Sequence, residues 1–232
     1  MSDIVARQND VVLYERDARL FGPSQWLNDQ CIAYAFECLG ENVDARIVLL
    51  EPSTLFMAKM LGDSAALREV LSQPCKAGAV SLMEQLVLAT LVFMPINDKT
   101  DPDEHEGGGH WSLLVFRRDG PHGDRFEHYD SCAPANAVHA RAAVDVLTPL
   151  LISKAPWPKL VKMRSPLQAN GFDCGMYVLA IAELLCRSLP ALNAGVTFEV
   201  AREAAAAAVR ELAPAAVTAK RAEWLERVRT AS

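Results

Sequence analysis

Cys174 is the side chain in this sequence best placed to act as a nucleophile. It directly precedes an apolar stretch over Gly175–Leu189 whose composition predicts a buried helix. A thiolate is favoured at a helix N-terminus, and more so beside an imidazolium, because both supply positive potential. Asn170 and Gly171 indicate a tight turn just upstream, so we predict a loop-to-helix elbow in which Gly175 leaves room for an incoming acyl group. Most cysteines that open an apolar helix are small core residues, so the assignment depends on partners elsewhere in the chain.

His110 is the histidine best placed to be the general base for such a nucleophile. It follows the glycine run Gly107–Gly109 and precedes a predicted strand over Trp111–Phe116, and functional side chains commonly lie where a loop meets a rigid strand. The next predicted strand, Arg125–Tyr129, ends one residue before Asp130. If the two strands pair, Asp130 lies at the same sheet end as His110 and accepts its Nδ1 proton.

Gln168 and the other histidines complete the set of candidates. Gln168 precedes Cys174 by six residues (174 − 168 = 6), so its amide can join the Cys174 backbone N–H in stabilising an oxyanion. His128 is two residues from Asp130 on the same face of the strand, which makes it the rival base, although a position inside a strand favours a packed role. The remaining histidines lie in polar loops or on a helix surface, where we expect them to be solvated: His105, His122 and His139.

Hydrophobic periodicity defines the elements that must position these residues. Predicted helices span Trp26–Leu39 with Ser24 as its cap, two short segments between Pro52 and Ser72, Ala137–Ser153, Gly175–Leu189, and Ala204–Ala208 and Ala219–Val228 on either side of Pro214. Predicted strands span Val11–Tyr14, Leu86–Ile96, Trp111–Phe116, Arg125–Tyr129 and Leu160–Met163. A helix that crosses between strands is typical of a mixed sheet. We therefore expect an α+β fold, a single domain over residues 1–232 with a central mixed β-sheet flanked by helices.

The composition disfavours several classes of protein. The sequence is 51% hydrophobic with a formal net charge of −6, which provides no general attraction for nucleic acid or for an anionic membrane surface. The longest apolar run, Val87–Ile96, is shorter than the roughly 18 residues that cross a bilayer, and we predict that it is a buried strand. The N-terminal residues show no signal-peptide pattern, so the six cysteines are expected to be reduced. We expect an intracellular monomer, in the cytoplasm, the nucleus or both.

Four segments of the sequence together resemble the ubiquitin-like-modifier proteases, also called sentrin-specific proteases. They are Trp26–Asp29, Gly109–Leu113, His128–Ser131 and Gln168–Gly175, and the order His, Asp, Gln, Cys is that of the family. The long polar loop from Ile96 to Gly109, and the Ser-Leu-Leu-Val after His-Trp, are most similar to the deneddylase branch. The resemblance implies a papain-like cysteine protease fold in which the catalytic cysteine begins a buried central helix.

For catalysis, the resemblance implies an ion pair between His110 and Cys174. Asp130 then holds the imidazole, and Gln168 contributes to the oxyanion hole. The reaction it implies runs through an acyl-enzyme thioester that water hydrolyses. No metal ion or organic cofactor takes part in it.

For the substrate, the resemblance implies a ubiquitin-like modifier ending in Gly-Gly, the neddylation modifier first among them, cleaved from its precursor or from lysines of its conjugates. Trp26 and Trp111 would wall a tunnel that only glycine passes, and Asp29 would meet a basic residue of the modifier tail. Core packing is the alternative role for both tryptophans. Some residues are not required by the family core and bear on the choice of modifier: Asp101, Asp103, Glu104, Glu106 and Cys132.

Three other functions stay open at this point. A SUMO-specific protease of the same family fits the same motifs. An acyltransferase on a related thiol-enzyme scaffold passes the thioester to an amine instead of to water. A binding module that holds a modifier without cleaving it normally lacks the Cys or the His, whereas Cys174 and His110 are both present, so it ranks last.

Overall fold

A five-stranded mixed β-sheet forms the centre of the molecule. The computed structural model describes residues 3–41, 43–74, 79–101, 108–118, 123–187 and 198–231. The sheet order is β3-β4-β5-β6-β7, with bounds β3 Ile47–Leu49, β4 Leu91–Asn97, β5 Trp111–Arg117, β6 Arg125–Tyr129 and β7 Lys159–Lys162. The β3–β4 and β6–β7 pairs are parallel, whereas β4–β5 and β5–β6 are antiparallel. The predicted α+β fold with a mixed sheet is confirmed.

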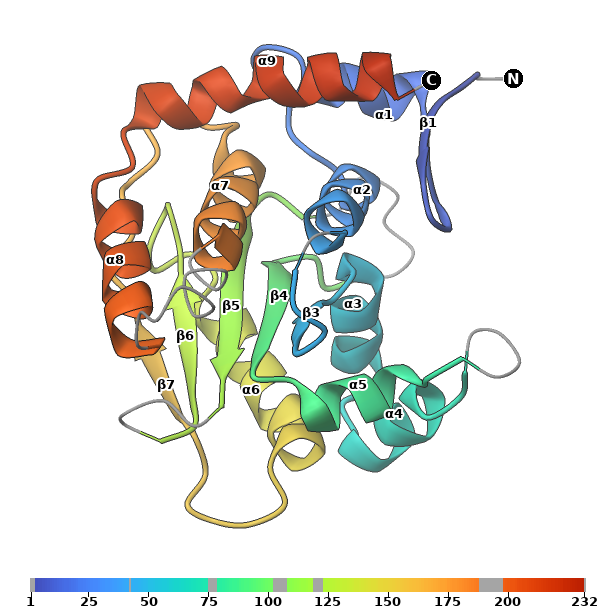
Figure 1. Cartoon of the computed structure of the whole chain (residues 1–232), viewed down its shortest axis with the longest axis vertical. Helices are drawn as coiled ribbons and strands as arrows, with labels where there is room; N and C mark the ends of the chain where they lie inside the picture. The colour runs from blue at the N-terminus through green and yellow to red at the C-terminus, as the bar shows by residue number, and fades with distance from the viewer. Residues whose placement is uncertain are drawn as a thin grey trace.

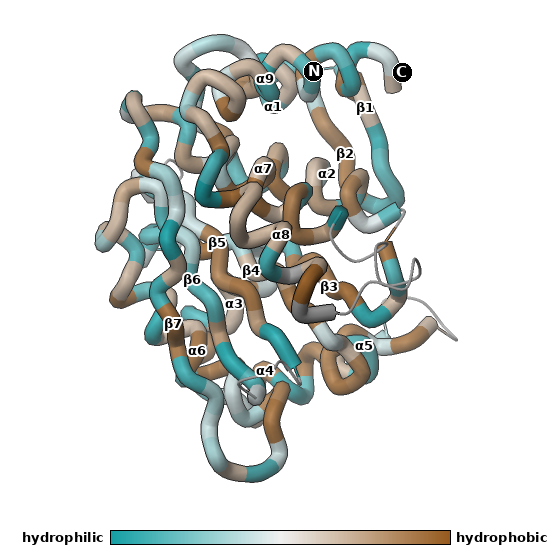
Figure 2. Tube along the Cα trace, turned by 60° about the vertical axis from the view of Figure 1, so that its left-hand side comes forward, coloured by the Kyte–Doolittle hydropathy of each residue, from teal (hydrophilic) through white to brown (hydrophobic). Residues whose placement is uncertain are grey.

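Helices cover both faces of this sheet (Figure 1). One face carries α2 (Asp29–Gly40) and α7 (Cys174–Arg187), and the other carries α3 (Pro52–Leu61), α4 (Ser64–Leu71), α5 (Leu82–Leu88) and α6 (Ala137–Leu151). Successive residues of β5 point to opposite faces, so Leu113 joins the α2–α7 core and Leu114 the α3–α6 core. A strand that is buried on both faces usually consists of consecutive apolar residues. Figure 2 shows this for β5, where the tube is largely brown.

The two ends of the described chain lie close together (Figure 1). The hairpin of β1 (Ile4–Gln8) and β2 (Val11–Tyr14) leads into α1 (Glu15–Ala18) and the 3₁₀ turn η1 (Arg19–Phe21), and the last helices are α8 (Phe198–Arg210) and α9 (Pro214–Thr230). Helix α9 runs across the top of the molecule in Figure 1 and contacts α7, η1 and β1. The Trp224 ring stacks on Phe21 with 6.0 Å between centroids, so the last helix is fixed to the N-terminal region.

The strand ends that position the candidate site lie together at one end of the sheet. Asn97, the last residue of β4, pairs with Trp111, the first residue of β5. Strand β6 runs antiparallel to β5 and ends at Tyr129. Antiparallel pairing therefore brings the end of β4, the start of β5 and the end of β6 to one edge. His110 and Asp130, which flank Trp111 and Tyr129 in the sequence, lie together there.

Helix α2 begins three residues later than the periodicity predicts, and Ser24 is not its cap. Ser24 lies in a turn with a φ of 58°. The cap is Asn28, whose Oδ1 accepts the Cys31 N–H at 2.9 Å. Because the helix starts only after this cap, Trp26 stays in a loop, where it is 53% exposed.

The predicted strand Leu86–Ile96 is wrong over its first part. Ser81 and Glu84 form a capping box that starts α5 instead, since the Glu84 N–H donates to Ser81 Oγ at 3.2 Å and the Ser81 N–H to Glu84 Oε2 at 2.8 Å. The apolar run Val87–Ile96 is therefore not one buried strand, and Val87 is 52% exposed. Among the described residues, no helix is long and apolar enough to cross a membrane.

The remaining predicted helices and strands are present, two of the strands with the predicted ends, Val11–Tyr14 and Arg125–Tyr129, and the others with shifted ends. Pro214 separates the last two helices as predicted, and it is the first residue of α9, where a missing N–H costs nothing. The predicted end of the central helix, residues 188 and 189, lies outside the described residues. Strands β1 and β3 were not predicted, and β3 is too short, with three residues, to show a period.

Candidate active site

Cys174 is the first residue of α7 and is 3% exposed at the end of a tight loop. The side chain of Asn170 shapes this loop, because its Oδ1 accepts the N–H groups of Phe172 at 3.1 Å and of Asp173 at 3.0 Å. The carbonyl of Asp173 then accepts the Tyr177 N–H at 2.9 Å in the first turn of the helix. The thiol therefore lies at the positive end of the helix dipole, in an elbow of the predicted kind.

Packing gives a reason for glycine at position 175 in addition to the predicted room for an acyl group. A Cβ atom on Gly175 would lie 3.0 Å from Cβ of Leu27 and 3.2 Å from its Cδ1. Without a side chain at this position, the segment that contains Leu27 can approach the start of α7 closely. This contact brings the loop of Trp26 next to Cys174.

His110 and Asp130 form a buried pair at the sheet edge. The Nε2 atom of His110 lies 2.7 Å from Oδ1 of Asp130, and the two residues are 8% and 4% exposed. The expectation that Nδ1 faces Asp130 is wrong. The carboxylate also accepts the N–H groups of Cys132 at 2.9 Å and Asn136 at 3.1 Å, which fix its position beside Nε2. The proximal nitrogen, Nδ1, is then the one that remains for Cys174.

The charges of this pair stabilise each other. Burial lowers the pKa of His110, but the hydrogen bonds to Asp130 and Cys174 and their negative charges outweigh burial and raise that pKa to about 10. Burial raises the pKa of Asp130, and the His110 imidazole with two backbone N–H groups more than offsets this and holds it below its usual value. At neutral pH the pair is therefore an imidazolium beside a carboxylate, the state that favours a neighbouring thiolate.

Polar side chains hold the backbone of His110 from both sides. Oδ1 of Asp98 accepts the N–H groups of Gly109 at 2.7 Å and of His110 at 3.1 Å. Asn136, which is 0% exposed, donates from Nδ2 to the carbonyl of His110 at 3.2 Å and to a β4 carbonyl at 3.1 Å. Neither residue was identified from the sequence. Asp98 could have been identified from its place just after a strand end. No sequence pattern distinguishes Asn136.

Asn136→Ala is expected to lower both the free energy of unfolding and kcat/KM. The change removes two buried hydrogen bonds, each worth about 0.5–1.5 kcal/mol net, although the His110 carbonyl still accepts a bond from Asn97 Nδ2 at 3.3 Å. It also loosens the backbone of His110, so kcat/KM for a modifier C-terminal ester should fall about 10- to 100-fold. Urea unfolding and initial rates measure the two effects.

The matched control for Asn136→Ala is Thr148→Val in helix α6, which Asn136 directly precedes. Thr148 Oγ1 donates to the Val144 carbonyl at 2.7 Å and is buried, but it has no bond to His110 or Asp130. Thr148→Val should lower stability and leave kcat/KM unchanged. An equal loss of activity in both variants would contradict a positioning role for Asn136.

Gln168 lies at the elbow with its amide held at both ends. Its Oε1 accepts the Ser131 hydroxyl at 2.8 Å, and its Nε2 donates to the Asn170 carbonyl at 2.7 Å. Its backbone N–H donates to the Ser131 carbonyl at 2.9 Å. One amide N–H is thus used inside the loop, and the other is the one that can serve an oxyanion.

Trp26, Trp111 and Asp29 line one cavity of about 710 Å³. Trp26 is too exposed to be a core residue, whereas Trp111 is 8% exposed and its Nε1 donates to the Leu27 carbonyl at 2.9 Å. Trp111 is thus both a core residue and a wall. Gly108, two residues before His110, lines the same cavity. Most of the other lining side chains are apolar and come from α3, β4 and α6, among them Leu55, Phe56, Met57, Ile96, Ala143 and Val146.

Lys59 and His139 also line this cavity. The Lys59 ammonium donates to the Lys99 carbonyl and lies 3.2 Å from Nδ1 of His139. Burial lowers the pKa of both Lys59 and His139. His139 is therefore not simply solvated, contrary to the prediction. Other residues considered from the sequence lie outside the described residues: His105, His122, Asp103, Glu104 and Glu106.

His128 is packed inside the sheet. Its Nε2 lies 2.9 Å from Ser112 Oγ, and the residue is 5% exposed. Burial lowers its pKa, and its partner is a hydroxyl instead of a carboxylate, so it does not share the environment of His110. Within the part of the chain that the structure describes, no three His, Cys, Asp or Glu side chains are grouped to hold a metal ion.

Most of the chain, residues 25–201, matches the Ulp1 protease family, C-terminal catalytic domain. The chain belongs to this Ulp1 protease family. Sentrin-specific protease 8 of Homo sapiens is 30% identical over 99% of this chain and 98% of the human protein. NEDD8-specific protease 1 of Arabidopsis thaliana is 28% identical over 79% of this chain and 76% of the plant protein. The predicted family is confirmed.

Solved structures share the fold of this Ulp1-family protein. The C-terminal Ulp1 protease domain in complex with Smt3, the yeast ortholog of SUMO, has a TM-score of 0.68 and 14% identity, covering 100% of this chain and 89% of that one. The Xanthomonas campestris effector protein XopD bound to ubiquitin has a TM-score of 0.51 and 22% identity, covering 85% and 90%. The papain-like cysteine protease fold is confirmed, and the Ulp1-family protein is a cysteine peptidase.

Proposed function

We propose that this Ulp1-family protease cleaves the bond after the C-terminal Gly-Gly of a ubiquitin-like modifier. The observation that carries the proposal is the buried His110–Asp130 pair beside Cys174 at the start of α7. Such a pair and a thiol at a helix N-terminus supply a base and a nucleophile. The two reactions are maturation of the modifier precursor and release of the modifier from lysines of its conjugates. In this proposal residues 1–232 are one catalytic domain that acts as a monomer in the cytoplasm or nucleus.

The proposed reaction runs through a thioester on Cys174. The Cys174 thiolate attacks the carbonyl carbon of the last glycine, and the His110 imidazolium gives a proton to the leaving amine as the C–N bond breaks. Asp130 occupies Nε2, so Nδ1 is the atom that transfers the proton. A water molecule, deprotonated by the now neutral His110, then attacks the thioester and releases the modifier with a free carboxylate.

The proposed oxyanion hole uses groups of the same elbow. The backbone N–H of Cys174 and the side-chain amide of Gln168 would both donate to the oxygen that becomes negative in each tetrahedral intermediate. The bonds that Gln168 makes to Ser131 and Asn170 support this role, because they hold its amide in place before substrate arrives. A donor fixed in advance costs no reorganisation during the reaction.

The modifier tail is proposed to lie along the cavity and to pass between Trp26 and Trp111. A glycine has no side chain, so it is the residue that fits between two aromatic walls. The apolar lining contributed by α3 and α6 suits the residues that precede the glycines. Asp29, on the same cavity, is proposed to pair with a basic side chain of the tail.

The neddylation modifier is the proposed partner. NEDD8-specific protease 1 of Arabidopsis thaliana and sentrin-specific protease 8 of Homo sapiens are similar to this chain over most or nearly all of its length. The structure with Smt3 bound shares only 14% identity and supports the fold alone. Cleavage of SUMO and acyl transfer are the other outcomes that the experiment distinguishes.

A panel of modifiers with C-terminal electrophiles tests this proposal. NEDD8, SUMO and ubiquitin carrying a C-terminal vinyl sulfone are incubated with the protein, and the adduct is located by mass spectrometry. We expect the NEDD8 probe to react fastest and at Cys174. A faster SUMO or ubiquitin adduct would reassign the modifier, and no adduct at all would refute the protease proposal. Incubation with acyl-CoA and a protein acceptor should label nothing.

A further inference from the structure

The last helix, α9, carries an arginine whose guanidinium is buried and donates hydrogen bonds to other parts of the protein. Arg221 is 3% exposed. Its Nε, Nη1 and Nη2 atoms all donate, to Asp173 Oδ1 at 2.7 Å and to the carbonyls of Leu20 at 3.0 Å, Gly22 at 3.0 Å, Gln25 at 2.6 Å and Phe172 at 2.8 Å. Arg221 lies beyond the residues, 25–201, that match the family.

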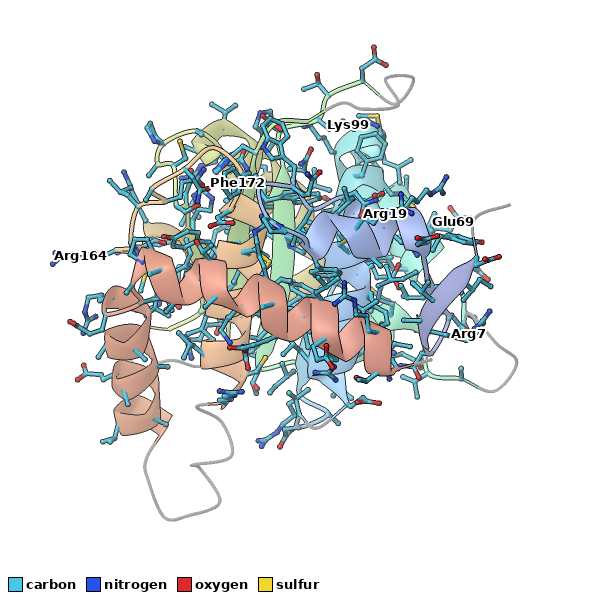
Figure 3. The ribbon with its side chains drawn as sticks, turned by 90° about the horizontal axis from the view of Figure 1, so that it is seen from above. Arg7, Arg19, Glu69, Lys99, Arg164 and Phe172 are labelled. Atoms are coloured by element: carbon cyan, nitrogen blue, oxygen red, sulfur yellow. The ribbon has the colours of Figure 1, made fainter. Side chains whose placement is uncertain are left out.

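These acceptors belong to two separate loops at the candidate site. Gln25 directly precedes Trp26, while Phe172 and Asp173 directly precede Cys174. The Nη2 atom alone donates to a carbonyl of each loop. Figure 3 looks down onto α9 with Phe172 labelled to one side of it, and the centroid of the Phe172 ring lies 5.5 Å from the guanidinium carbon. One side chain therefore ties the loop of the proposed tunnel wall to the loop of the proposed nucleophile.

The carboxylate of Asp173 completes this bridge. Asp173 is 1% exposed, and its Oδ2 accepts the Asn170 amide at 2.9 Å and the Thr218 hydroxyl at 2.6 Å. Burial by itself would raise the pKa of Asp173. The donors around it, Asn170, Thr218 and Arg221, outweigh burial and hold that pKa below its usual value. The buried guanidinium of Arg221 is held in one position, because displacing it would break its bonds to the carbonyls and separate it from the Asp173 carboxylate.

We propose that Arg221 is a positioning residue that holds Trp26 and Cys174 at the separation needed to thread a modifier tail to the nucleophile. The inference rests on the proposed function, since it takes Cys174 as the nucleophile. Helix α9 then stabilises the geometry of the site in addition to contributing to the core. Without the bridge, the thiol of Cys174 stays next to His110, but Trp26 is no longer aligned with Cys174.

Arg221→Lys tests the proposal because lysine keeps the positive charge but lacks the planar fork that spans both loops. We expect kcat/KM for a NEDD8 C-terminal fluorogenic substrate to fall about 10- to 100-fold, as expected for a displacement near 1 Å. The rate of Cys174 alkylation by iodoacetamide, which needs no tail alignment, should stay at the wild-type level. The control is Val228→Ala, which removes an apolar side chain, 1% exposed, from the same helix. It should lower Tm and leave both rates unchanged.

Thr218→Val is the second variant, used if Arg221→Lys does not fold. Thr218 is exposed and gives one of the donors to Asp173, so its loss should reduce kcat/KM to a smaller extent and leave alkylation unchanged. The proposal is overturned if the folded variant keeps wild-type kcat/KM, or if hydrolysis and alkylation fall together. Wild-type hydrolysis is measured first. Its absence would overturn the proposed function itself, and this inference with it.

Discussion

Cys174→Ala is expected to reduce hydrolysis of a modifier C-terminal substrate to background. Alanine offers no nucleophile, and losing the nucleophile of a covalent hydrolase costs on the order of a million-fold in kcat. The side chain is small and 3% exposed, so the fold should persist and the protein should still bind its modifier. Rates with a fluorogenic NEDD8 substrate and calorimetric binding of free NEDD8 measure these two expectations separately.

Cys186→Ala is the matched control, because Cys186 lies in the same helix α7 and is 5% exposed. Burial raises the pKa of its thiol to about 12, so it is protonated at neutral pH and does not act as a nucleophile. This variant should keep the wild-type kcat/KM and the electrophile adduct. If Cys174→Ala hydrolysed the substrate at the wild-type rate and Cys186→Ala did not, Cys174 would not be the nucleophile.

Asp130→Asn is expected to lower kcat/KM by about 10²- to 10⁴-fold and to narrow its pH profile. The hydrogen bond that Asp130 accepts from His110 is the largest contribution that raises the pKa of His110, to about 10. The alkaline limb of the wild-type profile should therefore lie near that pH, where the imidazolium is lost. The asparagine amide carries no charge, so this limb should move toward neutral pH. An unmoved alkaline limb would contradict the role of Asp130.

The same pair predicts how stability depends on pH. The folded-state pKa of His110 is raised from 6.5, so its contribution is fully present below that value and is lost as the pH rises through about 10. The pKa of Asp130 is lowered from 3.8, so its contribution is present above that value and is lost as the pH falls through the folded-state pKa. The Tm difference between wild type and Asp130→Asn should thus shrink at alkaline pH. A constant difference would contradict the pairing.

The members of the pair could be found from the sequence because strand ends are visible there. His110 follows a glycine run and directly precedes β5, and Asp130 directly follows β6, so antiparallel pairing was enough to place both at one edge. The position of Cys174 at a helix start came from apolar composition in the same way. These expectations needed only local patterns and one assumption about strand pairing.

Contacts that depend on tertiary structure were not visible. The choice of Nε2 over Nδ1 depends on where the carboxylate of Asp130 lies in the folded protein, and the packing at Gly175 depends on how closely Leu27 approaches. Neither of these tertiary contacts produces a periodic pattern in the sequence. Arg221 was missed for the same reason, since an arginine on a polar helix surface and one buried under it look alike before packing is known.

The bonds of Arg221 also bear on when the site becomes complete as the chain folds. They join residues 201 and 196 positions apart, at Leu20 and Gln25. Contacts of such high sequence separation form late, because a long loop must close first. A chain still being synthesised can form the sheet edge with His110 and Asp130, yet it lacks every one of these bonds until α9 has emerged. We therefore expect the proposed nucleophile and its proposed alignment with the substrate to form at different stages of folding.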